Sequence, residues 1–371
     1  MKRIPRDPLR FDTFALLAHH LQQAKLPLNH RGALRRFIDD VKASARTSLA
    51  SPTFLHGQRA EALFEMVVAT LGQVKLLKRE DEGDVFHKFP HAIRPPDFRV
   101  ILADDTQALV EVKNYHQKEG SEPQTFRSDY VMELAAYARE MKCELFFATY
   151  WARWNTWTLV REHHLTRTDG RRSLSFPMAM AVNEMALVGD LSIASRAPLR
   201  FRFETKPISG PTLTRAGRHA SRQKQLLEFQ SAGIYSERGR ITDPVELRIA
   251  VFLMFYGRWR EGAQRVETNE HGGITAVEIP IEPDPESSMQ GQQGFDIVGA
   301  LSGMLSRLYR EKTTKKGRIA GVRTDFEPGE YANLIPPDFD WSRSMLPLWV
   351  FKMQPNANFK ESSNSPSTID G

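Results

Sequence analysis

The spacing of apolar residues along the chain changes after residue 51. Before that point, apolar residues recur every three or four positions and predict helices within residues 12–48: Phe14, Leu17, Leu21, Leu34, Phe37 and Val41. After it, the pattern predicts a helix near 56–71, strands near 84–89, 97–102 and 107–114, a helix near 127–141, and strands near 144–149 and 156–161. A helix, three strands, a helix and further strands are the order of an α/β sandwich.

Turn-forming residues divide the rest of the chain. Residues 207–211, which hold two prolines and a glycine, predict a linker. Asp243 as N-cap, Pro244 in the first turn and Glu246 three residues after the cap predict the start of a helix, and a further helix is expected at 295–310. We therefore expect a helical N-terminal segment at 1–50, an α/β domain at 51–207, an α+β region at 208–355 and a disordered tail at 356–371.

The composition is that of a globular protein. The chain has 371 residues, of which 41% are hydrophobic, and its longest apolar run, Ile249–Tyr256, is far shorter than the roughly 20 residues of a membrane span. A secretory signal would require an apolar stretch after the basic N-terminus, and we find none there. Cys143 is the only cysteine, which excludes an internal disulfide and a cysteine cluster for zinc. We expect a cytoplasmic protein without membrane contact.

The positive charge is concentrated at one end of the chain. The net charge is +6, and residues 1–50 hold ten lysines and arginines against four aspartates, so the remainder is balanced. A basic segment suits phosphate binding, because each neutralised phosphate releases counterions. A solvated helical face is the alternative interpretation.

The acidic and basic residues that suggest chemistry lie within predicted strands. Glu111 and Lys113 are two positions apart in an apolar run, so they point to the same face of a strand. If residues 104–106 form a three-residue loop, Asp97 lies opposite Lys113 and beside Glu111. A two-residue turn would place Asp97 on the other face, because one step of register reverses every side chain. A shared site thus requires an odd loop or a bulge.

Such a cluster suits phosphodiester hydrolysis with a metal. Asp97, Glu111 and the backbone carbonyl of Val112 offer the hard oxygen ligands that Mg²⁺ prefers, and Mn²⁺ is expected to substitute. A bound metal lowers the pKa of its water and stabilises charge on the phosphate, while Lys113 would position or activate the attacking water. A surface ion pair is the alternative for Glu111 and Lys113, but charges inside an apolar run need a reason to be there.

The motif Pro96-Asp97 followed by Glu111-Val112-Lys113 resembles that of the PD-(D/E)xK nuclease superfamily, which includes restriction endonucleases and Holliday-junction resolvases. The resemblance covers roughly residues 55–160 and implies a restriction-endonuclease-like core, a central mixed sheet of four or five strands flanked by helices. It also implies an acid on the helix before the sheet that completes the metal site, directly or through water. Glu61 lies on the flank of that helix expected to face the sheet, and Glu65 is the alternative. Tyr137, on the helix after Lys113, could also face the phosphate.

The resemblance implies a Mg²⁺-dependent endonuclease that acts on DNA, because most members cut DNA, and a homodimer, because many cut duplexes as dimers. Residues 208–355 suggest target recognition or binding of an effector or partner protein, as in restriction or anti-phage systems. A repair or junction-resolving nuclease, an RNA nuclease and a non-catalytic nucleic-acid-binding protein of the same fold are the alternatives.

One other segment copies the spacing of the motif. Asp190 precedes Glu204-Thr205-Lys206 by the same fourteen positions that separate Asp97 from Glu111. It lacks the proline before the aspartate and contains the turn-forming Pro198. We therefore expect Asp97, and not Asp190, to belong to the site.

Overall fold

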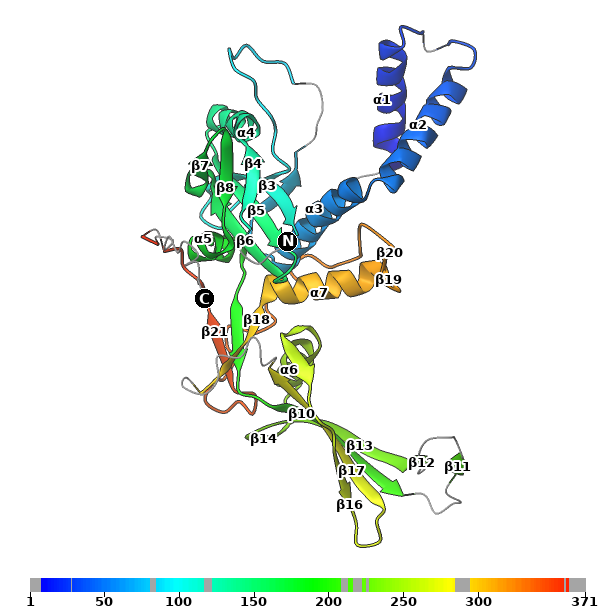
Figure 1. Ribbon diagram of the computed structural model, residues 1–371, viewed down its shortest axis with the longest axis vertical. Helices are drawn as coiled ribbons and strands as arrows, with labels where there is room; N and C mark the ends of the chain where they lie inside the picture. The colour runs from blue at the N-terminus through cyan, green and yellow to red at the C-terminus, as the bar shows by residue number, and fades with distance from the viewer. Residues whose placement is uncertain are drawn as a thin grey trace, which may run out of the picture. The chain divides into compact units, whose positions relative to one another are not determined.

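The computed structural model describes residues 8–27, 29–80, 85–116, 122–207, 213–215, 222–224, 227–283, 294–356 and 358–359 (Figure 1). The chain forms two compact units. The first contains residues 1–182, 311–330 and 356–371, and the second contains residues 183–310 and 331–355.

A five-stranded sheet forms the centre of the first unit. Its order is β1 (Leu76–Arg79), β2 (Phe98–Ile101), β3 (Gln107–Tyr115), β5 (Glu144–Trp151) and β6 (Thr156–Arg161). Strands β3 and β5 pair in parallel and the other neighbours are antiparallel, so the sheet is mixed. The central strand β3 is buried from Ala108 to Val112, as expected for a strand covered on both faces, and half-buried from Lys113 to Tyr115. The expectation of an α/β fold with a mixed sheet of four or five strands is confirmed.

Helices cover the two faces of this sheet. On one face, α3 (Pro52–Leu71) places Phe64 against Phe98, with ring centroids 5.4 Å apart. On the other, α4 (Ser128–Glu140) shares a buried core with Leu109 of β3. Because side chains alternate along a strand, Glu111 and Lys113 follow Leu109 toward the α4 face.

Smaller elements complete the first unit. Helices α1 (Pro8–Gln23) and α2 (Ala33–Ala50) pack together through the rings of His20 and Phe37, 5.6 Å apart. A three-stranded sheet next to α4 has the order β4, β8, β7. The remaining bounds are β4 (Gln124–Arg127), η1 (Glu162–His164), β7 (Thr166–Thr168), β8 (Arg171–Leu174), α5 (Phe176–Ala181), β19 (Thr314–Lys315) and β20 (Arg318–Ile319).

The second unit is an α+β arrangement, as the sequence predicts for the C-terminal region, but it begins at residue 183 and not at 208, so it includes β9 and β10, and residues 311–330 belong to the first unit. Its larger sheet is antiparallel and has the order β14, β13, β10, β17, β15, with β16 also paired to β17. A second sheet has the order β18, β9, β21, and β11 pairs with β12. The bounds are η2 (Met185–Val188), β9 (Ser192–Ser195), β10 (Leu199–Pro207), β11 (Leu213–Arg215), β12 (Arg222–Lys224), β13 (Leu227–Ser236), β14 (Gly239–Ile241), α6 (Pro244–Tyr256), β15 (Trp259–Glu261), β16 (Arg265–Thr268), β17 (Ile274–Pro283), β18 (Asp296–Ala300), α7 (Leu301–Thr313) and β21 (Leu348–Phe351).

Two expected elements differ in the structure. Residues 85–89 form no strand, and Phe86 is 93% exposed, whereas β1 precedes them at Leu76–Arg79. The helix expected at 295–310 begins only at Leu301, because β18 occupies the residues before it. The expected linker begins at the end of β10, and its residues 208–211 lie outside the described residues, as does nearly all of the expected tail.

Among the residues that the structure describes, no helix has both the length and the apolar character needed to cross a membrane.

Candidate active site

The β2–β3 hairpin sets the position of the first acidic residue. Phe98 pairs with Val110, so continuing the register places Asp97 opposite Glu111. The hairpin closes where the Leu102 amide donates to the Thr106 carbonyl at 2.9 Å.

The loop is odd, as a shared site requires, but it begins one residue earlier than expected. The register is consequently two residues away from the prediction, which set Asp97 opposite Lys113. The expected partner was wrong, yet a shift of two residues keeps every side chain on its face. Asp105 adopts a left-handed conformation with φ of 71° in this loop, as the last residue of a three-residue hairpin loop commonly does.

Lys113, Glu111 and Tyr130 form a hydrogen-bonded cluster between β3 and α4. The Lys113 ammonium donates to Glu111 Oε1 and, at 2.9 Å, to the Tyr130 hydroxyl. That hydroxyl in turn donates to Glu111 Oε1. Glu111 is only 4% exposed, so its charge is balanced by these two donors and not by water.

Two pKa shifts describe the electrostatics of this cluster. Burial lowers the pKa of Lys113, but Glu111 and Tyr130 outweigh it and hold that pKa above its ordinary value. Burial and the negative charge of Glu111 raise the pKa of Tyr130 above its ordinary value. At neutral pH the lysine is therefore an ammonium and the tyrosine a neutral hydroxyl.

Asp97 differs from Glu111 in its surroundings. Its Oδ2 accepts the Val112 amide at 2.7 Å. Burial, followed by the charge of Glu111, raises the pKa of Asp97 to about 7, although Lys113 opposes the shift. Asp97 and Glu111 are two carboxyl groups crowded at one position, the arrangement that a bound cation relieves.

Glu61, the expected helix acid, is engaged elsewhere. Its carboxylate pairs with Arg79 of β1 and accepts from the Gln58 amide at 3.3 Å, while Arg79 also reaches Glu65 at 3.4 Å. Helix α3 covers the sheet face opposite to that of Glu111, which directs Glu61 toward Arg79. The charge of Glu61 still contributes to the raised pKa of Asp97. Within the described part of the chain, no three acidic, histidine or cysteine side chains are grouped closely enough to hold a metal.

Tyr130 was not identified from the sequence. Tyr137, which the sequence suggests could face the phosphate, instead donates to Glu80 Oε2 at 3.4 Å. The two tyrosines lie seven residues apart, so they share one face of α4, and the residue nearer the N-terminus is the one that reaches Lys113. The sequence signal that could have identified Tyr130 is its position on the same face of the helix as Tyr137.

A small cavity of about 330 Å³ lies beside the cluster. Its lining residues include Tyr130, Arg94 and Arg127. The Arg94 guanidinium lies 5.1 Å from the centre of the Tyr130 ring and donates to Glu133 at 3.0 Å. Arg127 likewise pairs with Asp129, so both arginines of this cavity are paired with carboxylates that also line it.

Together, the fold and the cluster define a mixed-sheet α/β protein with two carboxyl groups and a lysine at the middle of the sheet. No family model and no curated protein matches the sequence. Among solved structures, the chain is similar to Hjc, a Holliday junction resolvase from Archaeoglobus fulgidus, with 21% identity over 28% of this chain and 76% of the resolvase, and a TM-score of 0.22. This similarity is too low to transfer chemistry, which rests on the side chains of this chain.

Proposed function

We propose that this protein is a Mg²⁺-dependent nuclease that hydrolyses phosphodiester bonds, with DNA as its substrate. The observation that supports the proposal best is the placement of Asp97, Glu111 and Lys113 on one face of neighbouring strands, with the ammonium bonded to Glu111 and Tyr130. A half-buried lysine held beside a carboxylate, next to a second carboxyl group of raised pKa, is typical of a catalytic site.

The donor set suits a hard divalent ion. Asp97, Glu111 and the carbonyl of Val112 would hold Mg²⁺ or Mn²⁺, because these ions prefer oxygen ligands. The crowding that raises the pKa of Asp97 is the feature that a cation would relieve. When bound, the metal would supply Lewis acidity and an activated water.

The charge state of Lys113 limits its role. Its pKa lies above the ordinary value, so at neutral pH it donates hydrogen bonds and cannot accept a proton. Lys113 would therefore hold the attacking water or stabilise the negative charge that develops on the phosphate. Tyr130 would keep the ammonium in position, since its hydroxyl contacts both Lys113 and Glu111.

Glu61 would act on this site from a distance. It is paired with Arg79, so we propose that it completes the site through a water molecule and through its charge on Asp97. Residues 1–50 would add affinity for the DNA backbone, because they carry ten basic residues. The setting we propose is restriction or anti-phage defence by a homodimer, with the second unit recognising the target or an effector.

The test is cleavage of supercoiled plasmid, linear duplex, single strands and RNA of equal length in Mg²⁺, Mn²⁺ or EDTA. The wild type should cut DNA only with metal, and Lys113→Ala should reduce the rate on the order of 10³-fold. Lys206→Ala is the matched control, because Lys206 belongs to the segment that copies the spacing of the motif. Metal-independent cutting, or equal activity of Lys113→Ala, would refute the proposal.

A non-catalytic binding protein is separated from a nuclease by a second measurement. DNA binding without cutting under every metal condition, unchanged by Asp97→Ala, would assign the fold to binding alone. Preference for RNA over DNA would correct the substrate and leave the site assignment intact.

A further inference from the structure

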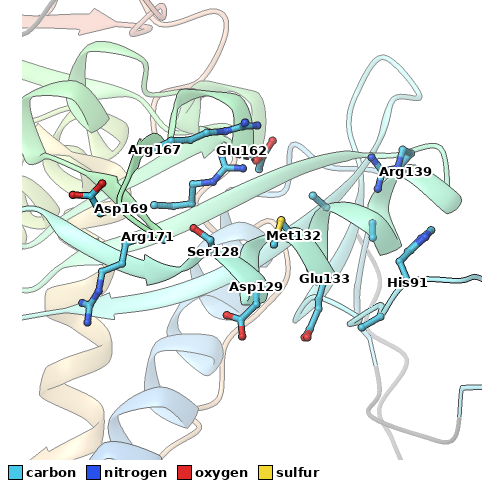
Figure 2. Close-up of a pocket in the computed structure, with 15 residues that line it drawn as sticks. His91, Ser128, Asp129, Met132, Glu133, Arg139, Glu162, Arg167, Asp169 and Arg171 are labelled. Carbon is cyan, nitrogen blue, oxygen red and sulfur yellow. Dashed lines mark ion pairs between the residues drawn. The ribbon is translucent and has the colours of Figure 1, made fainter.

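A larger cavity of about 880 Å³ lies on another side of α4, between this helix and the β7–β8 hairpin (Figure 2). Helix α4 contributes residues from Ser128 to Arg139, and the hairpin contributes residues 167 and 169–172. This volume lies within the range of about 300–1,000 Å³ found for small-molecule sites. The cavity is separate from the cluster around Lys113, although both use α4.

The wall of the cavity carries arginines that have no ion-pair partner among the described residues. Within the described residues, Arg139, Arg167 and Arg171 make no ion pair and no side-chain hydrogen bond. The carboxylates of the wall are mostly engaged: Asp129 pairs with Arg127, Glu133 with Arg94, and Glu162 with Arg172. Asp169, at the hairpin tip, is the exception and lies at the end of the cavity away from Arg139 in Figure 2. The unpaired charge of the wall is therefore positive.

The hairpin is held in place by a buried ion pair. Arg172 is only 7% exposed, and its guanidinium lies 3.3 Å from Glu162 Oε1. A buried guanidinium needs such a partner, so Arg172 fixes the strand while its neighbour Arg171 remains exposed. The ion pair thus fixes the strand that carries Arg171, and Arg167 lies opposite Arg172 on the neighbouring strand.

The surface that α4 gives to the cavity is apolar between its charged ends. Met132, Ala135 and Ala136 line it, together with Ala92 from the segment before β2, and Met132 is 56% exposed. Small side chains and a flexible methionine leave room for a flat apolar group. A phosphodiester backbone alone would need the arginines but not this surface.

We infer that this cavity binds a nucleotide as a small-molecule ligand. Its phosphates would be bound by Arg139 and Arg167, because guanidinium groups pair with phosphate oxygens in bidentate geometry. Its base would lie over Met132 and Ala135. Binding at this cavity does not depend on the proposed nuclease activity, because none of its lining residues is assigned to catalysis.

The experiment is isothermal titration calorimetry of the full chain with ATP, AMP and inorganic pyrophosphate, in EDTA and low salt. We expect ATP to bind with one site per chain. Arg139→Gln and Arg167→Gln should each raise its Kd about tenfold, because each removes charge-assisted hydrogen bonds. Arg318→Gln removes the same charge from the exposed strand β20, away from the cavity, and should leave Kd unchanged. Met132→Ala should weaken ATP several-fold but leave pyrophosphate binding unaltered, because only the base contacts the methionine.

Three results would overturn the inference. The first is no binding of any of the three probes at millimolar concentration. The second is ATP binding that survives the double variant Arg139→Gln/Arg167→Gln. The third is that the wild type binds no nucleotide, while Arg139→Gln or Arg167→Gln weakens binding of a short DNA duplex. That result would assign the arginines to the nucleic-acid backbone. Both arginines are exposed and pair with no other described residue, so circular dichroism should show the variants folded like the wild type.

Discussion

Asp97 and Asp190 begin the same spacing of residues, since each is followed fourteen positions later by Glu-x-Lys. Their surroundings are different. Asp97 lies beside another carboxylate and near a lysine, and its Oδ2 accepts one backbone amide. Asp190 accepts the Ser302 amide at 2.9 Å and the Ser302 hydroxyl at 2.5 Å, so it holds the first turn of α7.

The glutamates and lysines of the two segments differ in the same way. Glu111 is buried with Lys113 and Tyr130, whereas Glu204 accepts from Arg202 at 2.7 Å on β10, and Arg202 also pairs with Glu267. No hydrogen bond or ion pair between described residues joins Asp190 to Glu204 or Lys206. Asp190 and Glu204 of the second segment thus make two separate structural contacts.

Burial raises the pKa of both aspartates, to about 7 for Asp97 and about 6 for Asp190, so the shift alone does not distinguish a functional from a structural aspartate. The neighbouring groups distinguish the two. Hydrogen bonds from Ser302 oppose the shift of Asp190, while the charge of Glu111 adds to that of Asp97. A buried acid surrounded by donors stabilises the fold, and a buried acid beside a second acid stores repulsion that a ligand can relieve.

The largest expected effect is opposite in the two segments. Asp97→Ala should reduce metal-dependent plasmid cleavage on the order of 10³-fold and change the free energy of unfolding by no more than about 1 kcal/mol. Asp190→Ala should leave cleavage unchanged below its unfolding temperature and lower the free energy of unfolding by about 2–3 kcal/mol, because the Ser302 donors lose their acceptor in a buried position.

Plasmid nicking and urea denaturation of the two variants measure this contrast. Loss of stability in Asp97→Ala equal to that of Asp190→Ala would mean that Asp97 is also structural. Loss of cleavage in Asp190→Ala, at a temperature where it is folded, would assign the second segment to the site.

A smaller effect is expected in the pH dependence of stability. The folded pKa of Asp97, about 7, lies above its unfolded value of 3.8, so the folded state binds more protons between these values. Its contribution to stability is therefore lost as the pH rises from about 4 to about 7. Asp97→Asn keeps an acceptor for the Val112 amide and lacks the charge, so it should gain about 1–2 kcal/mol on the wild type between about pH 5 and pH 8.

Urea denaturation in EDTA at about pH 5 and about pH 8 measures the difference in free energy of unfolding between the wild type and Asp97→Asn. The titration of all other groups cancels in this difference. Added Mg²⁺ should stabilise the wild type at the higher pH and leave Asp97→Asn unchanged, because metal and proton compete for the same carboxylate. A pH-independent difference would show that the pKa of Asp97 is not raised.

Tyr130 tests the positioning of the lysine within the first segment. Tyr130→Phe keeps the ring near Lys113 and Arg94 but removes the hydroxyl that contacts Glu111, so the cleavage rate should fall about tenfold. KM for DNA should stay unchanged, because the hydroxyl is bonded within the protein. Tyr137→Phe is the matched control on the same helix and should cut at the wild-type rate.

The sequence predicted the parts of this site that depend on local pattern. Alternation along β3 placed Glu111 and Lys113 on one face, and the structure has them there. The sequence predicted the helices near 56–71 and 127–141 and the central strands within a few residues. Their apolar periodicity extends over enough residues to be distinct. Strand β1 was missed, because its residues Leu-Leu-Lys-Arg do not alternate between apolar and polar, while Val85 and Phe86 resemble a strand but lie in an exposed segment.

The remaining features depend on how elements pack, which periodicity does not contain. The register between Asp97 and Glu111 is set by a loop with a left-handed residue at Asp105, one position away from the expected loop. The choice of Tyr130 over Tyr137 depends on which turn of α4 lies over Lys113. An apolar stripe predicts which side of a helix is buried but not which face of the sheet it covers.

The smallest effect is expected at Glu61, whose place relative to the two faces of the sheet could not be predicted from the apolar stripe of its helix. The helix stripe favoured Glu61 over Glu65, and the structure brings both to Arg79. Of these two glutamates, Glu61 is the one whose charge adds to the effects of burial and Glu111 on the pKa of Asp97. Glu61→Gln should therefore change the cleavage rate two- to fivefold, on the order of 0.5–1 kcal/mol, and Glu65→Gln should leave it unchanged. Cleavage rates at several Mg²⁺ concentrations measure this. A loss above a hundredfold in Glu61→Gln would mean that Glu61 leaves Arg79 to bind the metal directly, and equal effects of both variants would assign them to the ion pair with Arg79.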